Sequence, residues 1–199
     1  MNMHPWRNAV KIEAEKWVGK VGGLDANQLL RGHDILIDIY KKAGLTETSI
    51  VRAWIPDVIS GIKRGRWVRK QPFAEEGGKW NVSTSVDTEG IAWCGIFATW
   101  VLKHCGWKLH WANRQMQSVN GDIKRYPQPG GGVAWRDLID VGDIIVVGDN
   151  NHHCVVTGTS PGSDSLSTVE GNLSLPLQAI DRRSQTRGKV HTMYKLSDL

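Results

Sequence analysis

Cysteine is scarce in this sequence of 199 residues, because the chain contains only three, too few for a scaffold held together by disulfides. Since three is an odd number, at least one thiol stays unpaired in each monomer. Long apolar runs are also missing: the longest aliphatic run, residues 144–147, is far shorter than the ~20 residues that a membrane-spanning helix needs. Charged residues interrupt the first 18 residues, so we expect no conventional signal peptide and no membrane span.

Phenylalanine and tyrosine are rare as well, with two and three residues, whereas tryptophan occurs ten times. Such an excess of Trp suits flat ligands such as sugars or bases, but it also suits an ordinary core. Basic residues outnumber acidic ones by 25 to 20, which gives a net charge of +5 and a pI near 9.2. Because the basic residues are dispersed along the chain, we expect no nucleic-acid partner.

Hydrophobic residues make up 40% of the chain, enough for one sizeable core, so we expect a single domain over residues 1–199. Apolar residues at helical spacing predict helices near residues 6–18, 26–43, 48–62 and 93–104, with a long polar loop at 65–90. Short apolar runs between turn signals predict strands at 144–147, 154–157, 165–170 and 190–196. Helices first and antiparallel strands second predict an α+β fold, with a helical portion at 1–87 and the catalytic core at 88–199.

Cys94 and the pair His152-His153 are the candidate reactive residues. Cys94 begins a predicted helix, where the helix dipole and a nearby imidazole would both favour the thiolate. Side chains alternate along a strand, so one histidine of the pair points toward the cleft. If it is His153, then Cys154 and Val156 face the core; if it is His152, the His153 ring lies on the core side and needs a partner there. This reasoning favours His153 as the base.

Glu170-Gly171-Asn172 ends the next predicted strand with a carboxylate and an amide. Either Glu170 or Asn172 could bind the imidazole and fix its tautomer, which would complete a catalytic triad. Cys105 and Cys154 are expected to be packing residues, since Cys is often buried. No His or Cys pair has the spacing of a Cys-x-x-Cys or His-Glu-x-x-His zinc motif, so we predict no metal site.

The order of these features resembles the CHAP and NlpC-type superfamily of papain-like cysteine amidohydrolases and peptidases. The motifs lie within residues 88–175 and are Trp93-Cys94, Val141-Gly142-Asp143-Ile144-Ile145-Val146, His153 before an apolar strand, and Glu170-Gly171-Asn172. The resemblance implies a papain-like fold without a cofactor, in which Cys94 is the nucleophile and His153 the general base. Glu170 or Asn172 would then orient the base, and Trp93 and His152 would contact the substrate. Cys154 is a departure, because many members have an aliphatic residue after the catalytic histidine.

The resemblance also implies a substrate, namely amide bonds in peptidoglycan stem peptides, cleaved by an antibacterial effector or a phage lysin. Without a signal peptide, such an enzyme would reach the cell wall through specialised secretion or phage lysis, and an immunity protein could bind its cleft. Two alternatives stay open: a papain-like toxin that acts on a protein in a target cell, and a catalytically silent module that binds wall glycans. The silent module would use tryptophans of predicted loops and element ends, namely Trp67, Trp80, Trp107, Trp111 and Trp135.

Overall fold

The computed structural model describes residues 5–23, 31–43, 93–112, 115–127, 132–148, 152–173 and 179–196. Three α-helices lie in these ranges: α1 (Pro5–Lys16), α2 (His33–Lys42) and α4 (Cys94–His104). Two short 3₁₀ helices, η2 (Ala134–Leu138) and η3 (Arg187–Lys189), flank parts of the sheet. None of the helices in the described ranges has the length and apolar character needed to cross a membrane.

The strands form two antiparallel sheets. The smaller sheet pairs β1 (Leu109–Ala112) with β2 (Gln115–Ser118). The larger sheet has six strands in the order β3-β8-β4-β5-β6-β7. Their bounds are β3 (Ile123–Tyr126), β4 (Ile144–Val147), β5 (His152–Thr159), β6 (Ser165–Leu173), β7 (Ala179–Thr186) and β8 (Val190–Leu196). The α+β class and the antiparallel sheet predicted from the sequence are therefore confirmed.

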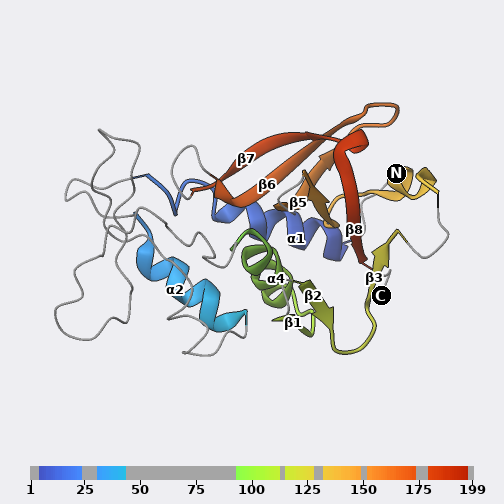
Figure 1. Ribbon diagram of the computed structural model, residues 1–199. Coiled ribbons are helices and arrows are strands. Elements are labelled where there is room, and N and C mark those ends of the chain that lie inside the picture. Colours follow the sequence, from blue (N-terminus) through green and yellow to red (C-terminus); the bar gives the residue numbers. More distant parts are fainter. Residues whose placement is uncertain are drawn as a thin grey trace, which may run out of the picture.

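The helices cover one face of the large sheet, below it in Figure 1. Helix α4 packs against β5 and β6, α1 packs against β5 and α4, and α2 packs on α4. Side chains alternate along β4 and β5, so Val146 and Val155 join the core under the helices, whereas Val147 and Val156 join a second core on the opposite face. This alternation decides on which side of the sheet each residue near Cys94 lies.

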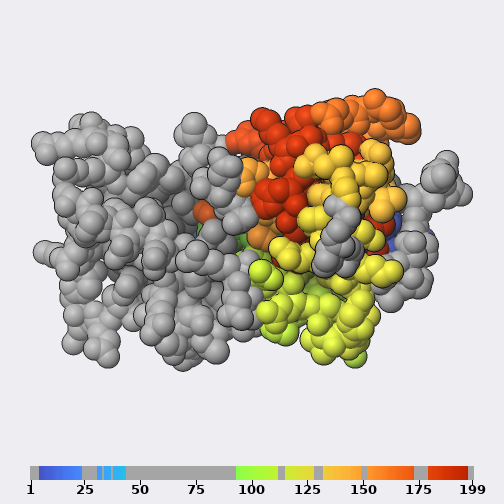
Figure 2. Space-filling view, turned by 45° about the vertical axis from the view of Figure 1, so that its right-hand side comes forward, coloured from blue at the N-terminus to red at the C-terminus, as the bar shows by residue number. Residues whose placement is uncertain are grey.

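The second face is covered by η2 rather than by a long helix. Figure 2 shows residues 132–148, in yellow to orange, lying against the red C-terminal strands. Arg136 Nε donates to the carbonyl of Val190 at 2.8 Å, and Lys195 Nζ donates to the carbonyl of Leu138 at 2.7 Å. The side chain of Trp135 is buried in the second core, so η2 closes this face.

Buried charges connect α1 to the turn before β4. The guanidinium of Arg7 lies 3.0 Å from Asp143 Oδ1 and donates to the carbonyl oxygens of Val141 and Leu196 at 2.8 and 3.2 Å. Asp143 also accepts a bond from the backbone N–H of Leu196 at 3.2 Å, and Lys195 Nζ lies 3.3 Å from its other oxygen. The Val-Gly-Asp motif of the sequence is therefore structural, because its carboxylate holds three segments together.

Several sequence predictions can be compared directly with these elements. The helices expected near 6–18 and 93–104 and the strands at 144–147 and 190–196 are confirmed. Strands β5 and β6 are longer than predicted, and α2 covers only part of the helix expected at 26–43. The helix predicted at 48–62 and the loop at 65–90 lie outside the described residues.

Four strands were not predicted, namely β1, β2, β3 and β7. Strand β7 is polar after its first two residues, and most of these residues are partly or fully exposed because β7 pairs only with β6 at the edge of the sheet. Such an edge strand lacks the apolar run or the clean alternation that identifies a strand in a sequence. The strands β1 to β3 have four residues each, too few to establish a period.

Candidate active site

Helix α4 places Cys94 at its first residue, at the edge of the core under the sheet. Trp93 occupies the N-cap position and makes no capping hydrogen bond through its side chain. The N–H groups of the first helical turn have no partner within the helix and carry the positive end of its dipole. Gly95 is needed here, because a Cβ at this position would overlap the ring of Trp111. The sequence thus places a thiol at the first residue of a helix, whose first turn carries unpaired backbone donors.

Strand β5 brings both histidines to Cys94. The backbone N–H of His153 donates to Cys94 Sγ at 3.5 Å, and hydrogen bonding and charge from both imidazoles lower the pKa of this thiol. The ring of His153 is buried between Trp111 and Tyr194, with ring centroids 5.1 and 6.0 Å away. The side chain of His152, at the beginning of the strand, is 24% exposed, so solvent reaches the group from this side.

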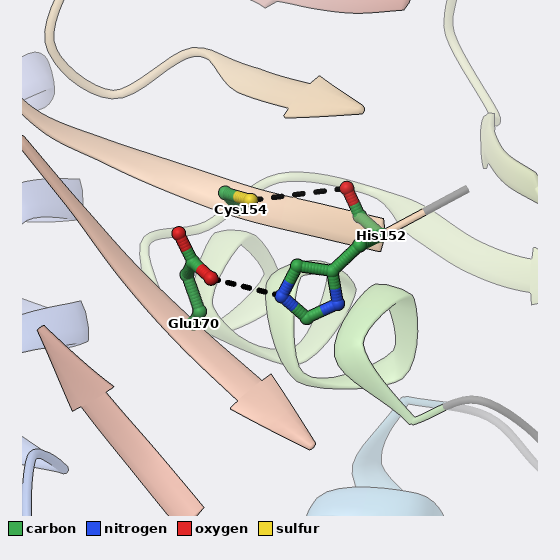
Figure 3. A group of neighbouring side chains, drawn as sticks. All are labelled: His152, Cys154 and Glu170. Carbon is green, nitrogen blue, oxygen red and sulfur yellow. Dashed lines mark hydrogen bonds and ion pairs between the residues drawn. The ribbon is translucent and has the colours of Figure 1, made fainter. Parts of the chain in front are cut away.

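Strand β6 supplies a carboxylate to His152. Glu170 Oε2 lies 2.9 Å from His152 Nε2, as Figure 3 shows. The other oxygen, Oε1, accepts hydrogen bonds from Thr168 Oγ1 and from Gln185 Nε2, the latter at 2.8 Å. Glu170 is 1% exposed, so these bonds hold its buried carboxylate in one orientation. Because Nε2 of His152 is bound to Glu170, the other ring nitrogen is the one left for Cys94.

The three groups shift one another's pKa values. Burial raises the pKa of Cys94, but hydrogen bonds from His152 and His153 and the charges of both rings lower it to about 6. Burial lowers the pKa of His152, but its bonds to Cys94 and Glu170 raise it to about 10. Burial raises the pKa of Glu170, and its bonds from His152, Thr168 and Gln185 lower it more, so the net shift is downward. Near neutral pH these pKa shifts favour a thiolate at Cys94, an imidazolium at His152 and a carboxylate at Glu170.

The structure brings Cys94, His152 and Glu170 together, whereas the sequence favoured His153 as the base. The predicted base, His153, lies on the helix side of the strand as alternation requires, but its ring is enclosed there, and the Glu170 carboxylate contacts His152. The alternation argument assumed that one face alone reaches Cys94, whereas the thiol lies at the start of β5, within reach of both imidazoles. Asn172 lies past Glu170 at a bulge in β6, with a positive φ of 62°.

Trp93, which the resemblance implied as a substrate contact, is a buried core residue. Its side chain is 1% exposed and belongs to the core under the helices. A Cβ at Gly171 would lie 2.6 Å from the indole of Trp93, so the absence of a side chain at Gly171 allows the close packing. Among the predicted loop tryptophans, Trp107 and Trp135 are also buried, and Trp111 is partly buried; Trp67 and Trp80 lie outside the described residues.

Two residues near the site were not predicted to take part in it. Tyr40 of α2 is fully buried, and its hydroxyl has no hydrogen-bond partner within the described part of the chain. Burial raises the pKa of Tyr40, and the negative charge of a Cys94 thiolate raises it further. Cys154 lies with His152 and Glu170 on one side of the sheet. The spacing of Cys154 from His152, two residues along a strand, was a signal for this neighbourhood, whereas nothing local connects Tyr40 to Cys94.

No protein-family model, curated protein or solved structure matches the chain. The chemistry of the site therefore has to be argued from its residues and their geometry.

Alkylation of the three thiols by iodoacetamide is expected to separate Cys94 from the others by pH. Thiolate is the reacting form, so the rate at Cys94 should reach half of its plateau near pH 6, in line with the pKa of about 6. Burial and the nearby charge of Glu13 raise the pKa of Cys105 to about 11, and burial raises that of Cys154, so both should react slowly at pH 7. Mass spectrometry of labelled peptides measures each rate, and Cys94→Ala serves as control. A half-plateau for Cys94 near pH 8.5 or above would contradict an activated thiolate.

Proposed function

We propose that this protein is a cysteine hydrolase of papain-like type that cleaves amide bonds in peptidoglycan stem peptides. The observation that carries the proposal is the chain of contacts from the helix-start thiol through His152 to the buried carboxylate of Glu170. The reaction class follows from this chemistry, since a thiolate beside an oriented imidazolium suits acyl transfer. The substrate class rests on the resemblance of the motif order to the CHAP and NlpC-type superfamily.

His152 is the base in this proposal, and Glu170 is the residue that orients it. The hydrogen bond at 2.9 Å fixes the ring of His152 and stabilises its protonated form. The imidazole of His152 is also the more exposed of the two, so a leaving amine or an entering water can reach it. His153 has a different part: its backbone N–H and its ring stabilise the thiolate from the enclosed side.

The reaction begins when the Cys94 thiolate attacks the carbonyl carbon of the scissile amide, and the C=O electron pair moves onto oxygen. Collapse of this tetrahedral intermediate breaks the C–N bond, while the imidazolium of His152 gives its proton to the departing amine. A thioester to Cys94 remains. His152, now neutral, takes a proton from water, the resulting hydroxide attacks the thioester, and the carboxylic acid leaves as the thiolate is restored.

In this mechanism the backbone donors at the start of α4 bind the negative oxygen of the intermediate. The N–H groups of a first helical turn have no acceptor within the helix and carry the positive end of its dipole. The phenol of Tyr40 is a buried O–H donor without a partner in the described part of the chain, and its pKa is raised by the Cys94 thiolate. In this mechanism Tyr40 donates to the oxyanion, an interaction that gains strength only as charge develops on the oxygen.

Tyr40→Phe is expected to lower kcat by about 10- to 100-fold with little change in KM, because loss of one oxyanion donor costs about 10²- to 10³-fold at most. The ring stays in place, so the packing of α2 against α4 should be kept. Steady-state kinetics on purified substrate measures the change. Phe97→Leu, which alters a core ring near Cys94 without removing a donor, is the matched control. An unchanged kcat in Tyr40→Phe would remove Tyr40 from the mechanism.

Digestion of purified peptidoglycan tests the proposed function directly. Wild-type protein should release fragments whose masses correspond to hydrolysis of one type of stem-peptide amide bond, and Cys94→Ala should release none. If the wall is untouched and Cys94-dependent cleavage occurs on proteins of a target cell instead, the substrate is protein. If Cys94→Ala keeps the full biological effect, the protein is a binding module and the hydrolase proposal fails.

Delivery and regulation follow from this function as further parts of the proposal. As a wall hydrolase, the protein would reach its substrate through a specialised secretion system or through phage lysis. An immunity protein that covers the exposed edge of His152 would protect the producing cell. Co-purification of the protein with products of neighbouring genes would test the second point.

A further inference from the structure

Cys154 lies beside the proposed catalytic group but has no part in the proposed reaction. Its sulfur, a ring nitrogen of His152 and a carboxylate oxygen of Glu170 all lie within 4.8 Å of one another. In Figure 3 the carboxylate of Glu170 is directed at the imidazole ring of His152, while the sulfur of Cys154, on the neighbouring strand, donates to the backbone carbonyl of His152 at 3.8 Å. A thiol, an imidazole and a carboxylate are the three ligand types that zinc prefers in proteins.

The strand register explains why these side chains meet. His152 and Cys154 are two residues apart in β5, and Cys154 is directly opposite Glu170 in β6. Side chains two residues apart on a strand, and those directly across from each other, share one face of a sheet. The sequence contains no local zinc motif, but this ligand set needs none, because it is assembled across two strands.

The spacing needs only small movements to hold a metal. Zinc bonds of about 2.0–2.1 Å to nitrogen, about 2.0–2.2 Å to oxygen and about 2.3 Å to sulfur place tetrahedral ligands roughly 3.3–3.6 Å apart. His152 Nε2 and Glu170 Oε2 are 2.9 Å apart, so the pair has to open by a few tenths of an ångström, about 0.4 Å. The sulfur, which donates to the carbonyl oxygen of His152 at 3.8 Å, has to approach by roughly 1.2 Å at most from the 4.8 Å limit.

The surroundings already hold the carboxylate as a metal ligand would be held. Thr168 and Gln185 both donate to Oε1 of Glu170 and leave Oε2 to face His152. Outer hydrogen bonds of this kind orient ligand groups and raise metal affinity. The partly exposed ring of His152 leaves a path from solvent to an otherwise buried group.

We propose that His152, Cys154 and Glu170 bind one Zn²⁺ ion, with water in the fourth position. Binding replaces the proton of the Cys154 thiol and the proton on Nε2 of His152, both of which are released to solvent, and no group is oxidised or reduced. The metal takes Nε2 of His152 and Oε2 of Glu170, the two atoms whose bond orients the base. Zinc is therefore an inhibitor of the hydrolase, a consequence that rests on the proposed function, whereas the binding itself does not.

Competition against a chromogenic zinc chelator, with tag-free protein, tests the site without reference to activity. Wild type is expected to bind one equivalent of zinc, and Cys154→Ala should bind at least tenfold more weakly. Cys94→Ala should bind as tightly as wild type, because Cys94 is not a ligand. Cys105→Ala is a matched control for loss of a thiol outside the cluster. Loss of binding in Cys94→Ala but not in Cys154→Ala would place the metal on the Cys94–His152 pair and overturn the proposal, as would the absence of zinc binding by wild type.

Cobalt(II) gives a second readout of the same site, since a bound thiolate produces a charge-transfer absorption in the near ultraviolet. The band is expected in wild type and Cys94→Ala and absent in Cys154→Ala and Cys154→Ser, with thermal unfolding showing that each variant is folded. Cys154→Ser keeps the volume of the side chain, so it serves if Cys154→Ala does not fold. A band that persists without Cys154 would contradict the proposal.

Inhibition is measured afterwards on peptidoglycan. Zinc should stop wild type reversibly, with activity restored by EDTA, while Cys154→Ala should need at least tenfold more zinc for the same inhibition. If wild type binds zinc as expected but hydrolyses nothing, the proposed function fails and the metal site stands. Equal sensitivity of wild type and Cys154→Ala would show that zinc acts elsewhere.

Discussion

His152→Ala is expected to lower kcat/KM on peptidoglycan by about 10³-fold or more, because it removes both the proton donor and the partner of Glu170. The matched variant is His153→Phe, which keeps a ring between Trp111 and Tyr194 and removes only the nitrogens. It should retain much more activity, with a loss of about tenfold, since the backbone N–H to Cys94 remains. Steady-state kinetics on the same substrate compares the two.

The pH profile is a second readout of this assignment. In wild type, kcat/KM should be bell-shaped, rising as Cys94 deprotonates near pH 6 and falling as His152 deprotonates near pH 10. Glu170→Gln keeps the size of the side chain but removes its charge, so the upper limb should move to lower pH. A larger loss in His153→Phe than in His152→Ala would restore His153 as the base. An upper limb that does not move in Glu170→Gln would remove Glu170 as the orienting group.

Arg7→Met is expected to lower the free energy of unfolding by about 3–5 kcal/mol, the usual cost of leaving a buried charge without its partner. Asp143 is fully buried, and the guanidinium of Arg7 at 3.0 Å is one of its two cationic neighbours. The substitution also removes hydrogen bonds to the carbonyl oxygens of Val141 and Leu196. Urea unfolding followed by circular dichroism measures the change.

Two variants distinguish the contribution of the buried Arg7–Asp143 network from that of an exposed ion pair. Arg182→Ala breaks an ion pair with Glu15 whose arginine is 64% exposed, and the loss should be about 1 kcal/mol or less. The double variant Arg7→Met with Asp143→Leu removes both buried charges together and should recover part of the loss. If Arg7→Met lowers the free energy of unfolding no more than Arg182→Ala does, the buried network stabilises the fold no more than an exposed ion pair.

The sequence predicted the elements whose signal is local. Helix α4 and strand β4 are made of continuous apolar residues bounded by turn signals, so burial of those residues dictates both the element and its place in the core. It also identified Cys94 as a candidate reactive residue, because the neighbouring residues place this thiol at a helix start. The edge strand β7 escaped prediction because pairing with β6, rather than an apolar pattern, makes it a strand.

Local patterns in the sequence could not decide which of His152 and His153 pairs with Glu170. Alternation correctly separates the faces of β5, but it does not say where the thiol lies relative to the end of the strand. The pairing of His152 with Glu170 depends on the register between β5 and β6, and that register is fixed by contacts along both strands. The effect of the Cys94 thiolate on the pKa of Tyr40 likewise depends on the packing of α2 against α4.

The scarcity of cysteine made each thiol in the sequence informative, and the sequence by itself determined that at least one is free and that Cys94 begins a helix. Only the tertiary structure decided what surrounds the thiols. It set His152 against Glu170, enclosed His153 and Trp93, and brought Cys154 into the same group. The physical reason is that periodicity and helix ends are properties of neighbouring residues, whereas a site is made by strand register and helix packing between residues far apart in the chain.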